Sequence, residues 1–110
     1  MSSRMNLYQY EGKIVRVIDT DGRAFTGMYP LDESRMMIGR VVVLPEYRCQ
    51  GIGTMVVSEC EVWAEELGYS KTVVDSRENK VGFYEQMLYE ACGEAVDGDT
   101  FRCIRMEKDL

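Results

Sequence analysis

The feature that most constrains the fold is a strong helical period over residues 51–67, with an apolar strand predicted on each side. Apolar side chains recur there at steps of three and four residues, which places them on one helix face. The flanking runs, Met36–Leu44 and Lys71–Val74, contain the β-branched residues that strands favour. Gly68 stands where the helix is expected to end. Two strands joined through a helix pair in parallel with a right-handed crossover, so the chain should contain a βαβ unit.

The other predicted elements are short strands in hairpins and one further helix. Strands are expected at Asn6–Tyr10, Ile14–Ile18, Ala24–Tyr29, Ala91–Val96 and Phe101–Met106, with hairpin turns at Glu11-Gly12, Asp21-Gly22 and 97–99. Ser76 should cap a second helix that runs to about Met87. The unbroken apolar run Met36–Leu44 predicts a strand buried on both faces. Because 110 residues suffice for one core, we expect one α+β domain over residues 1–110 with a mixed, mostly antiparallel central sheet.

Composition excludes several classes of protein. The chain has 13 Lys and Arg against 19 Asp and Glu, a net charge of −6, which argues against nucleic acid as a partner. It has no histidine, which removes His-based catalytic triads and most zinc sites, so no metal is expected. Residues 1–12 lack the pattern of a signal peptide, and no apolar run reaches the length of a membrane span. We therefore expect a cytoplasmic protein without a membrane partner, whose cysteines are reduced thiols: Cys49, Cys60, Cys92 and Cys103.

The loop before the predicted helix carries an arginine and two glycines. The first N–H groups of a helix have no backbone partner and carry the positive end of its dipole. Gly51 and Gly53 would let an anion approach the backbone closely, while Arg48 adds a positive charge and Thr54 a hydroxyl. These residues predict a phosphate or pyrophosphate site, although the spacing is neither that of a Walker loop nor that of the dinucleotide-binding fingerprint. A glycine-rich turn that only begins the helix remains the alternative.

Three segments, taken in order, are similar to a known family. The first is Arg48-x-x-Gly51-x-Gly53 after a valine-rich strand. The second is Arg77-Glu78-Asn79, followed three residues later by Phe83-Tyr84-Glu85. The third is the chain ending, with Gly93-Glu94, the 97–99 turn and residues 105–108. Together these segments resemble the GNAT superfamily of amine N-acetyltransferases over residues 35–110.

The resemblance implies a GNAT-like fold in which residues 35–110 bind acetyl-coenzyme A. In such a fold the backbones of Val41 and Val43 would pair with the pantetheine arm, and Asn79 would touch it. The loop amides would hold the pyrophosphate, at Arg48, Cys49, Gln50, Gly51, Ile52, Gly53 and Thr54. Tyr84 would protonate the leaving thiolate, for which a phenol is a suitable acid. Considered without the motif, Tyr84 would be an ordinary core tyrosine on a helix face.

The implied reaction is direct transfer of an acetyl group from acetyl-coenzyme A to the amine of a small molecule or peptide. The amine must lose its proton, and Asp75, at the end of a predicted strand, and Glu46, at the start of the loop, are the candidate bases. No base accompanies Cys49 or Cys60 in the sequence, so neither is expected to act as a nucleophile. Two other functions stay open: a non-catalytic acyl-coenzyme A binding module and, against the acidic charge, an RNA-binding fragment similar to the opening hairpin of Sm-like proteins.

The chain departs from the family pattern at two places. Residues 1–34 are too short for the family's first strand and two helices, and a β-meander is expected in their place. Without those helices the sheet would have uncovered apolar surface and an exposed edge, and a homodimer is expected to cover them. Leu88 stands where the family has a glycine, and leucine costs about 1 kcal/mol in a left-handed position. The glutamates of the predicted helix form either a solvated face or an acidic surface that steers a cationic amine: Glu59, Glu61, Glu65 and Glu66.

Overall fold

The structure, a computed structural model, describes residues 3–10, 13–20, 22–39, 41–97 and 102–110. Its strands are β1 (Ser3–Tyr10), β2 (Lys13–Thr20), β3 (Ala24–Pro30), β4 (Arg35–Ile38), β5 (Val42–Val43), β6 (Lys71–Arg77), β7 (Glu90–Asp97) and β8 (Arg102–Asp109). Its helices are α1 (Ile52–Glu66) and α2 (Val81–Gln86), each preceded by a 3-10 turn, η1 (Pro45–Tyr47) and η2 (Glu78–Lys80). None of the described helices is long and apolar enough to cross a membrane.

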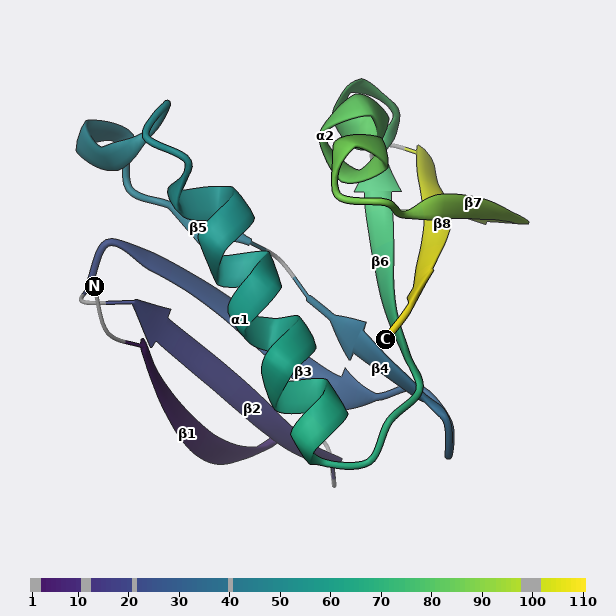
Figure 1. The fold of residues 1–110 in the computed structure, drawn as a ribbon, viewed down its shortest axis with the longest axis horizontal. Helices are drawn as coiled ribbons and strands as arrows, with labels where there is room; N and C mark the ends of the chain where they lie inside the picture. Colours follow the sequence, from purple (N-terminus) through teal and green to yellow (C-terminus); the bar gives the residue numbers. More distant parts are fainter. Residues whose placement is uncertain (1–2, 11–12, 21, 40, 98–101) are drawn as a thin grey trace.

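The described strands form one sheet in the order β1-β2-β3-β4-β6-β8-β7, and β5 pairs with β3. β4 and β6 run parallel and are joined through α1, whereas the other pairs are antiparallel. Both α-helices lie on one face of this sheet (Figure 1). The prediction of a mixed, mostly antiparallel α+β fold with one βαβ crossover is therefore confirmed.

The core lies between the two helices and this face of the sheet. Its buried residues come from β3, β4, β6, β8, α1 and the turn after α2: Met28, Met36, Ile38, Val57, Cys60, Ala64, Val74, Met87, Tyr89 and Met106. α1 ends beside Gly68, as the sequence predicted. Gly68 has a φ of +92°, and the N–H of Tyr69 donates to the Ala64 carbonyl at 3.0 Å. This bond belongs to a Schellman motif, which stabilises the last turn of a helix.

The strand predicted at Met36–Leu44 is interrupted, which corrects the sequence interpretation. Ile38 pairs with Met28 of β3, and Val42 pairs with Phe25. Four residue steps separate the two pairs on one strand and only three on β3, so one residue is extra and forms a bulge. β4 pairs with β6 only as far as Ile38 and Val74, and β5 pairs with β3. The prediction of burial on both faces holds for β4, but it is wrong for Val42, which is 45% exposed.

Because of this bulge, the two halves of the sheet diverge beyond β4. β6 continues to Arg77 along β8, whereas β5 stays with β3 and leads to the start of α1. Figure 1 shows β5 and the first turn of α1 on one side of the divergence, with the end of β6 and α2 on the other. This opening positions the candidate site described below.

The expected cap at Ser76 is also wrong. Ser76 is buried within β6, opposite Ile104 of β8, and its hydroxyl donates to the Arg77 carbonyl at 2.8 Å. The ladder with β8 holds the chain extended to Arg77, so it overrides the local capping signal. α2 begins only at Val81, after η2, and no side chain caps it.

The predicted hairpins pair as expected, β1 with β2, β2 with β3 and β7 with β8. Their turn residues 11–12, 21 and 98–99 lie outside the described residues. In the second hairpin Gly22 has a φ of +70°, and its N–H donates to Asp19 Oδ1 at 2.7 Å. β1, β2 and β3 thus form an antiparallel meander where the sequence predicted one. The homodimer expected to cover the sheet stays a prediction.

Candidate acetyl-coenzyme A site

The candidate site begins at the loop that joins β5 to α1. Cys49 and Gly51 both take left-handed conformations, with φ of +64° and +76°. No side chain caps the helix, and the first helical bond joins the Met55 N–H to the Gly51 carbonyl at 3.1 Å. The N–H groups of residues 52–54 therefore have no acceptor within the helix, and they carry the positive end of its dipole. Backbone donors gathered in this way suit an anion.

The side chains of the loop fold back onto its own backbone. Arg48 Nε donates to the Val43 carbonyl at 3.1 Å, and Gln50 Nε2 donates to the Glu46 carbonyl at 3.3 Å. Since Val43 directs its carbonyl to Arg48, that carbonyl is turned away from β3. Arg48, Cys49, Gln50 and Thr54 are all exposed. Hydrogen bonds from its own side chains thus stabilise the loop, and these four residues stay accessible to solvent.

Gly53 faces neighbouring side chains of the fold. A Cβ built on Gly53 would lie 3.6 Å from Phe83 Cζ and 3.7 Å from Val43 Cγ2, which are ordinary contact distances. This side of Gly53 therefore faces α2 and β5, and a small side chain would fit there. Ile52, which is 2% exposed, turns its side chain into a small cluster with Ala24, so only its backbone can contribute to an anion site.

Tyr84 lies on α2, between two other aromatic rings. Its ring meets Phe83 edge-on with centroids 5.0 Å apart, and it meets Tyr89 at 5.8 Å. Burial, followed by the nearby Cys60 of α1, raises the pKa of the Tyr84 phenol above its ordinary value. The phenol therefore keeps its proton throughout the neutral range, as a general acid must.

The turn after α2 has a left-handed residue at Leu88, the position where the family pattern has a glycine. Leu88 has a φ of +72° and is 75% exposed. The Leu88 N–H donates to the Glu85 carbonyl and the Tyr89 N–H to the Tyr84 carbonyl, both at 3.0 Å. These two bonds form a Schellman motif, and the contact between the Tyr84 and Tyr89 rings is the apolar pairing that accompanies it. Leucine therefore occupies a glycine conformation directly beside Tyr84.

Asp75 lies on β6 just beyond its last pair with β4. Arg105 holds the Asp75 carboxylate with two bonds, Nε to Oδ1 at 2.9 Å and a terminal nitrogen to Oδ2 at 3.2 Å. Side chains alternate along a strand, and Val74 faces the helices, so Asp75 faces the opposite side of the sheet. Tyr84 and Asp75 thus approach the opened sheet from its two faces. Asn79, in η2, is exposed.

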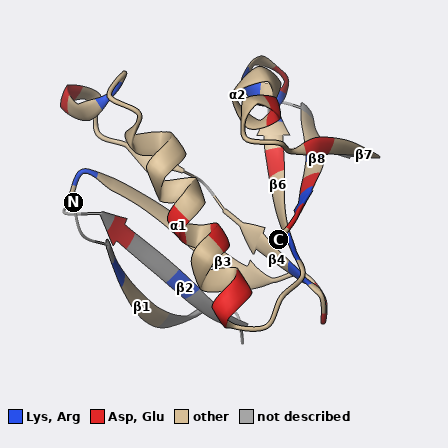
Figure 2. Cartoon of the chain, in the orientation of Figure 1, with Lys and Arg blue, Asp and Glu red and all other residues tan. Residues whose placement is uncertain are grey.

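Cys60 and the α1 glutamates show what the sequence could not reveal. Burial raises the pKa of the Cys60 thiol to about 12, so the thiolate needed for nucleophilic attack is absent near neutral pH. Figure 2 marks acidic residues in red along the later turns of α1. Glu61 is not part of a solvated face, because it binds Lys108 at 3.0 Å and Tyr89 at 2.9 Å. The sequence carries no signal for these partners, which come from β8 and from the turn after α2.

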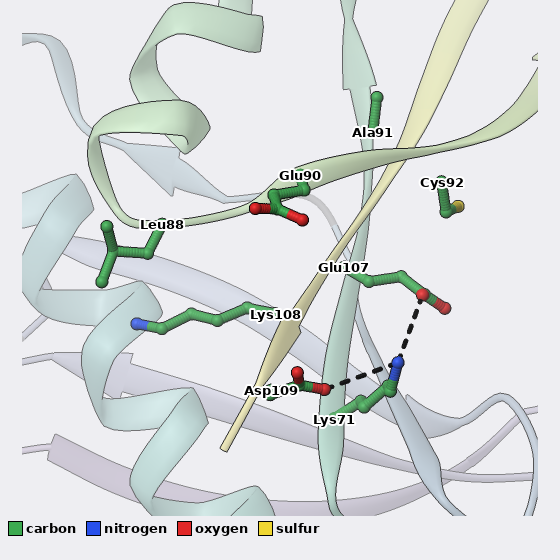
Figure 3. Close-up of a pocket in the computed structure, with 8 residues that line it drawn as sticks. All are labelled: Lys71, Leu88, Glu90, Ala91, Cys92, Glu107, Lys108 and Asp109. Carbon is green, nitrogen blue, oxygen red and sulfur yellow. Dashed lines mark ion pairs between the residues drawn. The ribbon is translucent and has the colours of Figure 1, made fainter.

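A hollow of about 380 Å³ lies away from this site, at the start of β6 (Figure 3). Its lining comes from β6, the turn after α2, the start of β7 and the end of β8: Lys71, Leu88, Glu90, Ala91, Cys92, Glu107, Lys108 and Asp109. Lys71 pairs with Glu107 at 3.6 Å and with Asp109 at 3.4 Å. These ion pairs join β6 to β8 beside the hollow, and none of the predicted site residues lines it.

Comparisons with known proteins agree with this geometry. A family model described as an acetyltransferase (GNAT) domain matches residues 1–110. A GNAT family acetyltransferase from Elizabethkingia anophelis with acetyl-CoA bound superposes with a TM-score of 0.72 and 12% identity, over 98% of each chain. The IAA acetyltransferase from Bacillus cereus superposes with a TM-score of 0.75 and 13% identity, over 99% of this chain and 100% of that one. An acyl-CoA N-acyltransferase from Pseudomonas aeruginosa superposes with a TM-score of 0.72 and 22% identity, over 87% of this chain and 68% of that one. The chain therefore belongs to the GNAT acetyltransferase family.

Proposed function

We propose that this acyltransferase moves an acetyl group from acetyl-coenzyme A to the amine of a small molecule or peptide. The observation that carries the proposal is the uncapped start of α1, with its left-handed Cys49 and Gly51, at the edge of the opened sheet. The Elizabethkingia protein, which has acetyl-CoA bound, matches this chain over 98% of both lengths. A chain as short as this one is therefore compatible with a complete cofactor site.

The residues present fit the proposed cosubstrate. The N–H groups at residues 52–54 have no helical acceptors, and Arg48 adds a permanent positive charge beside them, so they would take the pyrophosphate. Val43 lies in β5 and Val41 directly precedes it, at the divergence between β5 and β6. The backbone of Val41 and the N–H of Val43, whose carbonyl already accepts from Arg48, would bind the pantetheine arm together with Asn79. Acetyl-coenzyme A would supply the thioester, whose carbonyl carbon is the electrophile.

The chemistry then uses both faces of the sheet. The amine nitrogen forms a bond to the acetyl carbon, the carbon–sulfur bond breaks, and Tyr84 donates its proton to the departing sulfur. Asp75, on the other face, would take the proton of the amine through a carboxylate lone pair that Arg105 leaves open. Backbone N–H groups would stabilise the oxyanion. No cysteine acts in this scheme, in agreement with the raised pKa of the Cys60 thiol.

The test is a thiol-release assay with acetyl-coenzyme A and a panel of primary amines, including lysine and a peptide with a free N-terminus. We expect release to depend on the amine, and Tyr84→Phe to lower kcat about a hundredfold with little change in cofactor affinity. Tyr69→Phe, in the turn after α1, removes a phenol that has no role in the proposed reaction, so it is the control and should behave like the wild type. Cofactor binding without amine-dependent release would instead identify a binding module, and the absence of binding would contradict the proposal.

The base is tested by breaking the Asp75–Arg105 ion pair from each side. Asp75→Asn and Arg105→Gln both remove the pair, but only Asp75→Asn removes the proton acceptor. We expect Asp75→Asn to lower kcat by about tenfold or more, and Arg105→Gln to retain most of the activity. Equal losses in the two variants would show that the pair has only a structural role.

A further inference from the structure

Tyr89, which follows the left-handed Leu88, is anchored at its hydroxyl in the core. The side chain is 2% exposed. Its O–H donates to Glu61 Oε2 of α1 at 2.9 Å, and its oxygen lies 2.8 Å from Thr72 Oγ1 of β6. Since the single phenol proton goes to the Glu61 carboxylate, the Thr72 hydroxyl donates to the Tyr89 oxygen. The ring is therefore fixed to two elements at once.

Glu61 is in turn held by Lys108 of β8. Lys108 Nζ donates to Glu61 Oε1 at 3.0 Å and lies 5.8 Å from the centre of the Tyr89 ring. The Glu61 side chain is 12% exposed, so this charge is largely withdrawn from water. A buried polar network adds rigidity when each of its members has a partner. The anchor of Tyr89 is thus satisfied from α1, β6 and β8.

The other end of Tyr89 supports Tyr84. The Tyr89 N–H donates to the Tyr84 carbonyl at 3.0 Å, and the two rings meet edge to face at 5.8 Å and 72°. α2 has only six residues, which is too short to hold its own geometry without outside contacts. The position of Tyr84 therefore depends on the residue that closes its helix.

We propose that Tyr89 is a positioning residue for Tyr84, because its anchored hydroxyl fixes the ring on which Tyr84 rests. The inference rests on the proposed function, in which Tyr84 is the acid. Displacing a catalytic group by about 1 Å can cost a hundredfold in rate, so loosening this anchor affects catalysis without removing any group that touches substrate. The start of α1, which would bind the cofactor, is not part of the network.

The test variant is Tyr89→Phe, which keeps the ring and removes the anchor. We expect kcat to fall about tenfold or more, while KM for acetyl-coenzyme A stays within about twofold. The high-pH limb of kcat should move to lower pH, since a displaced Tyr84 gains access to water and loses the burial that raises its pKa. Cys60 of α1, which also raises the pKa of Tyr84, is unchanged in this variant. Tyr69→Phe is the control, because Tyr69 closes α1 by the same backbone bond.

An unchanged kcat and an unchanged limb in Tyr89→Phe would overturn the proposal, and so would the same loss in Tyr69→Phe. If Tyr89→Phe does not fold, Thr72→Val removes one partner of the anchor at nearly constant volume and should shift kcat and the limb in the same direction. The titration of Tyr84, followed by magnetic resonance with isotope-labelled tyrosine, needs no turnover. A wild type that never releases thiol would refute the proposed function, and the Tyr84 titration would still decide whether Tyr89 positions that ring.

Discussion

Phe83 of α2 faces Gly53 of α1, and a Cβ built on Gly53 would lie 3.6 Å from Phe83 Cζ, an ordinary contact distance. This approach places α2 beside the first turn of α1. It brings the proposed acid, one residue further along α2, to the same end of the sheet as the proposed phosphate loop. The two parts of the site are thus connected by a side chain and a glycine that sequence reasoning had assigned to anion approach.

The two loop glycines should respond differently to alanine. Gly51 has a φ of +76° in open space, so Gly51→Ala should destabilise the protein by about 1 kcal/mol, lower Tm by roughly 5 °C and weaken cofactor binding. At Gly53 the added methyl meets its neighbours at ordinary contact distances, so Gly53→Ala should leave Tm nearly unchanged. Thermal melts and calorimetric titration of both variants measure this difference. A larger loss of stability in Gly53→Ala would contradict the assigned backbone geometry.

Replacing Leu88 by glycine should make the fold more stable. Its φ of +72° is unfavourable for leucine, and its side chain is 75% exposed, so Leu88→Gly should stabilise the fold by about 1 kcal/mol. Leu88→Ala is the control, because it removes the same exposed side chain without relieving the backbone. Denaturant unfolding compares the two variants. An equal gain in both would assign the effect to the side chain.

The pH dependence of kcat should show the raised pKa of Tyr84. The phenol donates only when protonated, so the alkaline side of the kcat profile should stay level to a pH near 10, the ordinary pKa of tyrosine, and should fall above it. A profile corrected for spontaneous thioester hydrolysis measures this limb. It should be absent in Tyr84→Phe. A limb well below that of free tyrosine, or one that persists in the phenylalanine variant, would show that another group donates the proton.

The cysteines should differ in reactivity. Cys49 is exposed on the loop, whereas Cys60 is buried with its pKa raised to about 12, so iodoacetamide near pH 8 should label Cys49 and spare Cys60. Desulfo-coenzyme A, which has no thiol of its own, should slow the labelling of Cys49 by occupying the loop. Mass spectrometry after timed quenching reads both rates, and labelling in denaturant confirms that Cys60 can react. Labelling of native Cys60 at the rate of Cys49 would refute this account of the core.

The sequence was sufficient to predict α1, because a 3.6-residue apolar period followed by Gly68 has few alternatives. The same reasoning missed the bulge after Ile38. A run of valines reads equally well as one strand or two, and the break follows from the register between β3 and β4. The opening of the sheet, on which the proposed site depends, therefore follows from the strand register and not from the pattern of apolar residues.

Tertiary partners explain the remaining differences. Ser76 has a local preference for a helix cap, but pairing with β8 extends β6 through it. Glu61 falls on the polar side of the predicted helix, yet it binds Lys108, which lies 47 residues later, and the buried Tyr89. Such pairings are fixed by the packing of segments that lie far apart in the sequence, and no spacing in the sequence encodes them.

The most direct test of the central claim follows backbone amide resonances while desulfo-coenzyme A is added. The account predicts that the amides of residues 48–54 shift first and most, with smaller shifts at Val41, Val43 and Asn79. Shifts confined to the hollow around Lys71 and Glu107, or no shifts at millimolar ligand, would contradict it.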